Sequence, residues 1–189
     1  MNRTTAPLAV TLALALACLL ALPLAAHGQE SKRAPSTPAE RKRVVEITRR
    51  LEKEPFGKGA NDDRVWLMKW IDEVPDVTIR YCPGPLFDLV EGDAPDKALW
   101  VQSLFGMASL AIEKPADAKD WVKAQVAGLE SALLAYRSAV KANPKAKLPA
   151  FERLLAKQKA GQLEDVVRQE MPACDPAYEE NGPLPSDAI

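Results

Sequence analysis

The chain has 189 residues and a nearly balanced charge, with 25 basic and 26 acidic side chains. This balance excludes the strongly basic surface that nucleic-acid recognition requires, and it gives no polybasic face for anionic lipid. The only histidine, His27, lies in the apolar leader described next. The rest of the chain has no imidazole for general-base catalysis or for binding a metal or haem. We therefore expect no catalytic residue, no cofactor and no metal site.

Residues 1–28 have the pattern of a signal peptide. Arg3 precedes a long apolar run, and Ala26 and Gly28 supply the small side chains of a cleavage site. Cleavage before Gln29 leaves a chain of about 160 residues, which is the size of one domain. We expect a periplasmic or secreted protein with no membrane-spanning segment after cleavage.

Two other fates of this leader stay open. The apolar run is long enough to cross a bilayer, so an uncleaved membrane anchor is one of them. The other is lipidation of Cys18, which follows small residues but is itself followed by the apolar Leu19 and Leu20.

After the leader we expect a disordered linker over 29–36, a helical domain over 37–171 and an irregular C-terminal tail over 172–189. The linker is polar, and the tail is rich in proline. The first helix begins at Thr37-Pro38-Ala39-Glu40, which is a capping box with proline at the first helical position, and it ends before Pro55.

A glycine-rich connector, Phe56–Gly59, leads to a second helix in the sequence NDDRVWLMKWIDEV. We expect Asn61 or Asp62 to be the N-cap of this helix. Trp66 and Trp70 lie four residues apart and therefore share one of its faces.

Residues 76–81 alternate without a partner strand, so we expect extended chain there, followed by a helical turn or two in PLFDLVEG. The next segment, residues 94–115, is apolar on nearly every side. Such a helix either spans a bilayer or fills the middle of a bundle. Its interior Gln102 and Ser103 and its modest length favour a core helix, and Gly106 permits a close neighbour.

A longer helix follows in the sequence DAKDWVKAQVAGLESALLAYRSAVKANP, whose apolar residues repeat at alternating spacings of four and three. The short link between the two helices predicts an antiparallel pair. Two further helices are expected, one from Pro149 to Gly161 and one over 162–171. The pattern predicts an all-α fold, a small helical bundle of about five to seven helices with a long antiparallel helix pair.

Two cysteines, Cys82 and Cys174, remain after the leader is removed. In an exported chain such a pair usually forms a structural disulfide, and a reactive dithiol is the alternative. Both cysteines lie in proline-rich segments that cannot satisfy their backbone by helix formation. Closing a loop of about ninety residues would stabilise the fold by roughly 4–5 kcal/mol in the chain-entropy model.

Large aromatic side chains recur along the expected helices and have two interpretations. They fill the core of a small bundle, or they line an apolar ligand pocket between helices. The candidates for such a pocket are Trp66, Trp70, Trp100, Trp121 and Tyr136.

Acidic residues cluster at NDDR, DLVEGDAPD and EKPADAKD, which coincide with expected helix starts. None of these clusters has the ligand spacing of a calcium loop, so helix capping is favoured over metal binding. Asp72, Glu73 and Glu130 are further acids. Glycoside chemistry without histidine would need two such carboxylates to converge in a cleft, and a solvated helix face is the favoured interpretation.

The runs LFGMASLAIEKP, AGLESALLAYRSAV and LLAKQKAGQLEDVV resemble an uncharacterised group of exported bacterial all-helical proteins. The resemblance covers roughly residues 40–170 and implies a helical fold. It implies no activity and no functional residue.

These observations favour an exported, non-enzymatic helical domain that binds a partner protein or serves to protect the cell envelope. The alternative is a carboxylate-dependent hydrolase, or a carrier of an apolar ligand, that uses the aromatic face of the helices. We expect no nucleic-acid partner.

Overall fold

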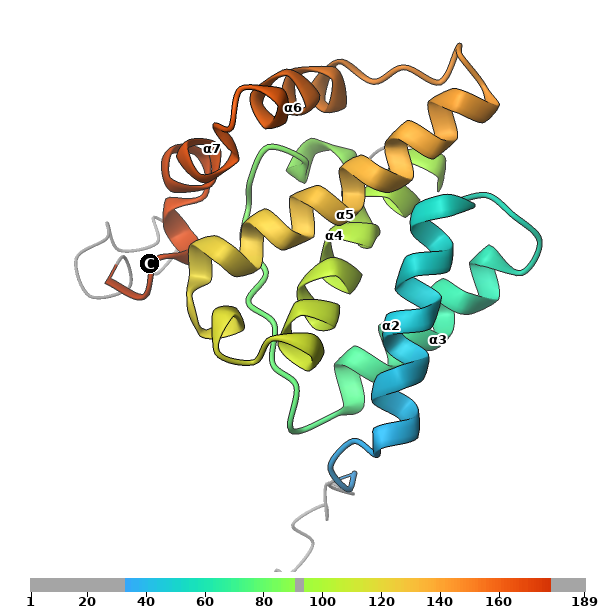
Figure 1. Cartoon of the computed structure of the whole chain (residues 1–189), viewed down its shortest axis with the longest axis vertical. Helices are drawn as coiled ribbons and strands as arrows, with labels where there is room; N and C mark the ends of the chain where they lie inside the picture. The colour runs from blue at the N-terminus through green and yellow to red at the C-terminus, as the bar shows by residue number, and fades with distance from the viewer. Residues whose placement is uncertain (1–32, 91–93, 178–189) are drawn as a thin grey trace, which may run out of the picture. The chain divides into compact units, whose positions relative to one another are not determined.

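The computed structural model describes residues 33–90 and 94–177 (Figure 1). Over these residues all regular structure is helical, which confirms the predicted all-α bundle. The expected signal peptide, with Cys18, and parts of the expected linker and tail lie outside the described residues. The described α-helices are α2 (Pro38–Lys53), α3 (Ala60–Glu73), α4 (Ala94–Glu113), α5 (Trp121–Ala142), α6 (Pro149–Lys159) and α7 (Leu163–Glu170), and the described 3₁₀ turns are η1 (Phe87–Val90), η2 (Asp117–Lys119) and η3 (Pro172–Cys174).

Helix α2 begins at the capping box that the sequence predicts. The side chain of Thr37 accepts a hydrogen bond from the Glu40 N–H, and the Glu40 carboxylate accepts one from the Thr37 N–H. Just before this cap, the N–H and the hydroxyl of Ser36 donate to the Asp76 carboxylate at 2.7 and 2.9 Å. Ser36 is therefore hydrogen-bonded to a residue 40 positions further along the chain.

The predicted N-cap of the second helix is wrong. Helix α3 begins at Ala60, and its N-cap is Gly59, whose φ of 81° is a left-handed conformation that glycine adopts without strain. Asn61 and Asp62 lie inside the first turn instead. The connector from α2 turns tightly, with the Gly57 N–H bonded to the Glu54 carbonyl, so the helix start requires a left-handed residue rather than a polar cap.

Helices α4 and α5 pack closely against each other, and α5 crosses in front of α4 in Figure 1. Ser103, in the first half of α4, meets Gly128 of α5. Ala111, near the end of α4, lines a cavity together with Trp121 at the start of α5. The two helices therefore run in opposite directions, as the short link between them predicts.

The approach of α4 to α5 is possible because Gly106 has no side chain. A Cβ at this position would lie 2.5 Å from the Cβ of Ser131 and 2.7 Å from the carbonyl oxygen of Ala127. Both distances are too short for any real contact between carbon or oxygen atoms. The close neighbour expected beside Gly106 is thus α5.

The core consists of two apolar clusters that share Trp100 of α4 as a neighbour. The first cluster joins α5 to α6 and α7, and in it the rings of Tyr136 and Phe151 stack at 4.6 Å. The second joins α2 and α3 to α4. Its most buried members are Val44, Ile47, Leu51, Leu67, Phe105, Met107 and Ala108.

Helix α4 belongs to both clusters, which agrees with the prediction that residues 94–115 form a core helix. Leu99 packs in the first cluster, and Leu104 and Phe105 pack in the second. Within residues 33–90 and 94–177, no helix combines the length and the apolar character that a membrane crossing needs.

The predicted stop at Gly161 is confirmed. Gly161 has a φ of 69°, and its N–H bonds the carbonyl of Gln158 at 3.0 Å. The N–H of Gln162 bonds the carbonyl of Lys157 at 2.9 Å, which completes a Schellman motif. This turn separates α6 from α7 and lets both helices cover the same side of α5.

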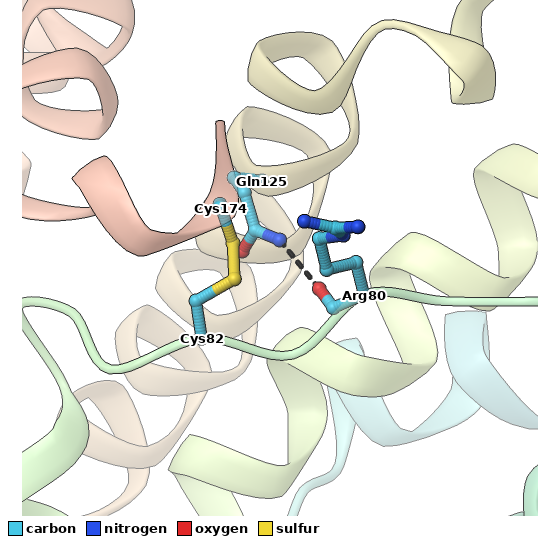
Figure 2. The surroundings of a disulfide bond; sticks show 4 residues. All are labelled: Arg80, Cys82, Gln125 and Cys174. Carbon is cyan, nitrogen blue, oxygen red and sulfur yellow. Dashed lines mark hydrogen bonds between the residues drawn. A yellow bond between two sulfur atoms is a disulfide. The ribbon is translucent and has the colours of Figure 1, made fainter. Parts of the chain in front are cut away.

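A disulfide joins Cys82 to Cys174, the pair that the sequence predicts (Figure 2). Cys82 lies in the extended chain after α3, and Cys174 lies in η3, with their Cα atoms 5.5 Å apart. Beside the bridge, the Nε2 of Gln125 donates a 2.6 Å hydrogen bond to the carbonyl of Arg80 (Figure 2). The extended chain is thus fixed both to the C-terminal turn and to α5.

Candidate functional site

An open groove of about 590 Å³ lies between α3 and the first half of α4. Its walls hold large apolar side chains that remain in contact with water. Phe56 is 50% exposed, Val65 is 61% exposed and Met68 is 37% exposed. The described residues that line this groove are Phe56, Asn61, Arg64, Val65, Met68, Pro95, Lys97, Ala98 and Val101.

Helical periodicity explains why α3 has apolar side chains on two sides. Leu67 and Trp70 point into the core and are almost fully buried. Val65 precedes Leu67 by two residues, or about 200° around the helix, so it points away from the core. Met68 follows Val65 by three residues and lies on the same side. The groove therefore uses a second apolar stripe of α3, distinct from the stripe that anchors the helix.

Phe56, in the connector before α3, lines the groove. The guanidinium of Arg64 lies 5.7 Å from the centre of the Phe56 ring and donates a hydrogen bond to the carbonyl of Pro55. These two contacts tie the Phe56 ring to α3. Phe56 is therefore a positioned wall of the groove.

The charged side chains among the described lining residues of the groove are Arg64 and Lys97. Asp63, the neighbour of Arg64, is engaged by Arg50, whose Nε and Nη2 donate to its carboxylate at 2.9 and 2.6 Å. Burial lowers the pKa of the Arg64 guanidinium, and the charge of Asp63 opposes this shift. The Nε of Arg64 is buried without a hydrogen-bond partner within the described part.

A second polar cluster lies buried where α2, α4 and α5 meet. The hydroxyl of Ser131 donates a 2.7 Å hydrogen bond to the Oε1 of Glu52, and the Nε2 of Gln102 donates to the same hydroxyl at 3.0 Å. Gln102 also donates to the carbonyl of Thr48 at 3.3 Å. The Cβ of Ser131 faces Gly106 across the helix crossing, and Ser131 is only 3% exposed. This cluster joins helices rather than forming a nucleophile site.

Two carboxylates converge on one arginine at the edge of this cluster. Arg49 donates to Glu52 at 2.8 Å and to Glu113 at 2.9 Å. Burial by itself lowers the pKa of Arg49, but the two carboxylates outweigh it and the pKa is raised. Because the guanidinium lies between them, the two acids do not face each other across a cleft as a glycosidase pair would. Asp72, Glu73 and Glu130 are exposed on their helices.

The structure distributes the five aromatic candidates over different environments. Trp70 is buried in the cluster of α2, α3 and α4, and Tyr136 is buried in the cluster of α5, α6 and α7. Trp66 is half-buried beneath the guanidinium of Arg43, which lies 4.0 Å from its ring. Trp121 lies at the start of α5. Trp121 lines the smaller cavity that it shares with Ala111, and none of these four residues lines the groove between α3 and α4.

Trp100 belongs to a separate aromatic row. Its ring meets the edge of Tyr81 at 5.3 Å, and the Tyr81 ring stacks on Phe87 at 6.4 Å. Tyr81 and Phe87 are each exposed by about two fifths, with values of 41% and 44%. Burial raises the pKa of Tyr81, and a contact with Trp100 opposes the shift. Trp100 thus packs against Tyr81 and is not among the described residues that line the groove.

Two acids of the last acidic cluster noted in the sequence, Asp117 and Asp120, accept hydrogen bonds from residues in the first turn of α5. Asp120 accepts hydrogen bonds from the N–H groups of Val122 and Lys123 at 3.0 and 3.3 Å and is the N-cap of α5. The carboxylate of Asp117 accepts a hydrogen bond from Lys123, which lowers the pKa of Asp117. Within the described ranges, no three side chains of the metal-binding types come together.

Sequence reasoning missed the residues that line the groove. One signal was available, because α3 has apolar residues outside the face of Trp66 and Trp70, namely Val65 and Met68. A helix with a second apolar stripe needs either a second neighbour or an exposed surface. Sequence alone gave no reason to place Phe56 or Val101 beside that stripe, because their positions depend on the connector and on α4.

Searches of family models, of curated proteins and of solved structures each find no match to this chain.

Proposed function

We propose that this protein is an exported, non-enzymatic helical domain that binds a partner protein at the groove between α3 and α4. The observation that carries the proposal is the presence of Phe56, Val65 and Met68 on one open apolar surface. Covering such side chains is favourable by roughly 25 cal/mol for each Å² of apolar surface removed from water. Contiguous apolar surface of this kind is typical of interaction sites.

Export is supported by two independent features. Residues 1–28 have the composition of a signal peptide. The disulfide between Cys82 and Cys174 belongs to a class of bond that persists in oxidising compartments.

The exposure of the groove walls favours a protein partner over an enclosed small ligand. Small-molecule sites bury most of the ligand surface, about 70–90% of it. Here the side chains of Phe56 and Val65 are each at least half exposed, at 50% and 61%. A partner that lies across the groove would cover them from outside. The carboxylate-dependent alternative has less support, because Glu52 and Glu113 are bridged by Arg49.

The proposal is tested by capture of partners from an extract of the source cells, with three forms of the chain. Val65→Asp places a charge in the groove at an exposed position, so the fold should persist. Leu134→Asp is the matched control, because Leu134 is a 42% exposed leucine on α5, away from the groove. Circular dichroism and melting confirm that all three forms fold.

We expect one or more proteins to be captured by the parent and by Leu134→Asp and to be lost with Val65→Asp. The captured protein, once purified, should bind the parent in calorimetry with a negative heat-capacity change, since apolar surface is covered. If Val65→Asp captures the same proteins as the parent in equal amounts, the groove is not the binding site.

A further inference from the structure

The two cations of the groove constrain what can occupy it. Arg64 lines one wall and Lys97 the other, and the described lining contains no carboxylate to neutralise them. Asp63 is already engaged by two nitrogen atoms of Arg50. A carboxylate on an occupant can pair with the charges of Arg64 and Lys97 where these two side chains line the groove.

The spacing of the groove residues matches a helix. On α3, Asn61, Val65 and Met68 follow each other at intervals of four and three, so they form a row about two turns, or roughly 11 Å, long. On α4, Ala98 and Val101 form a facing row at an interval of three. An apolar channel between two such rows is the kind of groove that binds the apolar face of an amphipathic helix. The side chains that enter it come from positions i, i+3 or i+4 and i+7 of that helix.

We propose that the partner presents an amphipathic helix with an acidic residue at the edge of its apolar face, and that this residue pairs with Arg64 and Lys97. This inference rests on the function proposed above and deepens it by naming the chemistry of the partner. The apolar face covers Phe56, Val65 and Met68, and the charge sets the orientation of the helix. Opposite charges at the rim of an interface mainly give specificity and faster association.

The test uses a displayed library of amphipathic helices about eighteen residues long, which is long enough for a peptide to hold helical structure. Leu, Met and Phe vary at the apolar positions, and Glu, Gln and Lys vary at the rim positions. The disulfide-bonded chain, Val65→Asp, Lys97→Glu and Lys159→Glu are used as baits. Lys159 is an exposed lysine on α6, so Lys159→Glu makes the same change of net charge away from the groove.

We expect the parent and Lys159→Glu to enrich helices with Glu at the rim, and Val65→Asp to enrich none. Lys97→Glu should weaken the selected acidic helices about fivefold to tenfold and favour Lys at the same rim position. Binding of the acidic helices to the parent should weaken with added salt, because the pair is partly exposed to solvent. Lys97 is exposed, so the Lys97→Glu variant should fold normally even if substitution of Arg64 disturbs the connector.

The possible failures are distinguishable. Selection of apolar helices without any preference between Glu, Gln and Lys would overturn the charge inference and leave the binding groove in place. If the parent selects no helix that Val65→Asp loses, the helix inference is overturned, and the capture experiment above decides separately whether the groove binds a protein. Saturable binding of dodecanoate at the groove, in the absence of selected helices, would assign the site to an anionic lipid instead.

Discussion

The hydroxyl of Ser131 on α5 donates a 2.7 Å hydrogen bond to the carboxylate of Glu52 on α2, although 79 residues separate them in sequence. Gln102 of α4 donates to the same hydroxyl. One buried serine thus connects the helix that begins the described domain with both helices of the central pair. The exposed fractions of Gln102 and Ser131 are 1% and 3%, so water does not replace these bonds when one is lost.

Ser131→Ala should therefore destabilise the protein. The change leaves Glu52 and Gln102 each without one hydrogen-bond partner in a buried place, which costs about 1–3 kcal/mol in the free energy of unfolding. Urea denaturation followed by circular dichroism measures this loss. Ser103→Ala is the control, because the Ser103 hydroxyl donates to a carbonyl of its own helix, that of Trp100. Equal costs for the two alanine variants would refute a connecting role for Ser131.

Substitutions of Gly106 should cost more as the side chain grows. A Cβ there meets Ser131 and a backbone carbonyl at under 3 Å, so alanine should cost about 1–3 kcal/mol and leucine more. Gly161 is the control, because its φ of 69° penalises any side chain by about 1–2 kcal/mol, but no atom lies within 4 Å of its Cβ position. At Gly106 the melting temperature of the Leu variant should lie well below that of the Ala variant, whereas at Gly161 the two variants should melt at similar temperatures. Similar melting temperatures for Ala and Leu at both sites would contradict the close approach of α4 to α5.

Removal of the disulfide should lower the free energy of unfolding by about 4–5 kcal/mol in the chain-entropy model, given its sequence separation of 92. The variant for this test is Cys82→Ala with Cys174→Ala, measured by urea denaturation. In parallel, the chain that begins at Gln29 is unfolded without reductant and treated with a thiol reagent. No reactive thiol is expected, and recovery of two thiols would contradict the bridge.

Stability should decline in acid partly through Asp76. Hydrogen bonds from the Ser36 backbone, and further bonds from Arg41 and the Ser36 hydroxyl, lower the pKa of Asp76 from 3.8 to about 2. A carboxyl group whose pKa is lower in the folded state stabilises the fold above its unfolded pKa. This contribution is therefore present above pH 4 and is lost as the pH falls towards 2.

Asp76→Asn should remove this part of the acid sensitivity. Melting temperatures of the parent and the variant should differ at pH 5 and approach each other near pH 2. Asp72→Asn is a suitable control, since Asp72 is an exposed acid near the end of α3. A constant difference between the parent and Asp76→Asn over the whole range would show that the pKa of Asp76 is not shifted.

Local sequence signals were sufficient for most of the helices. The capping box at Thr37, the heptad spacing of α5 and the stop at Gly161 each depend on residues within one or two turns, and each is found in the structure. The N-cap of α3 was mispredicted because Asn61 and Asp62 are good capping residues. The turn geometry that makes Gly59 the cap is fixed by the preceding residues 54–57.

The candidate site could not be predicted in the same way. The groove depends on the placement of Phe56 by Arg64 and on the separation of α3 from α4, which are tertiary properties. The buried partner of Ser131 was missed for the same reason, because Glu52 on an amphipathic helix has the sequence pattern of a solvated acid. Exposed apolar residues on a second face of α3 were the one local sign that the helix has an unused surface.

The bridge between Cys82 and Cys174 also sets an order of events during biosynthesis. Polypeptides are made from the amino terminus, so Cys82 emerges long before its native partner exists. The segments that become α4 to α7 all lie between the two cysteines, so they have been synthesised before this bond can form. Any association of these segments that precedes the completion of the chain has no covalent help from the bridge.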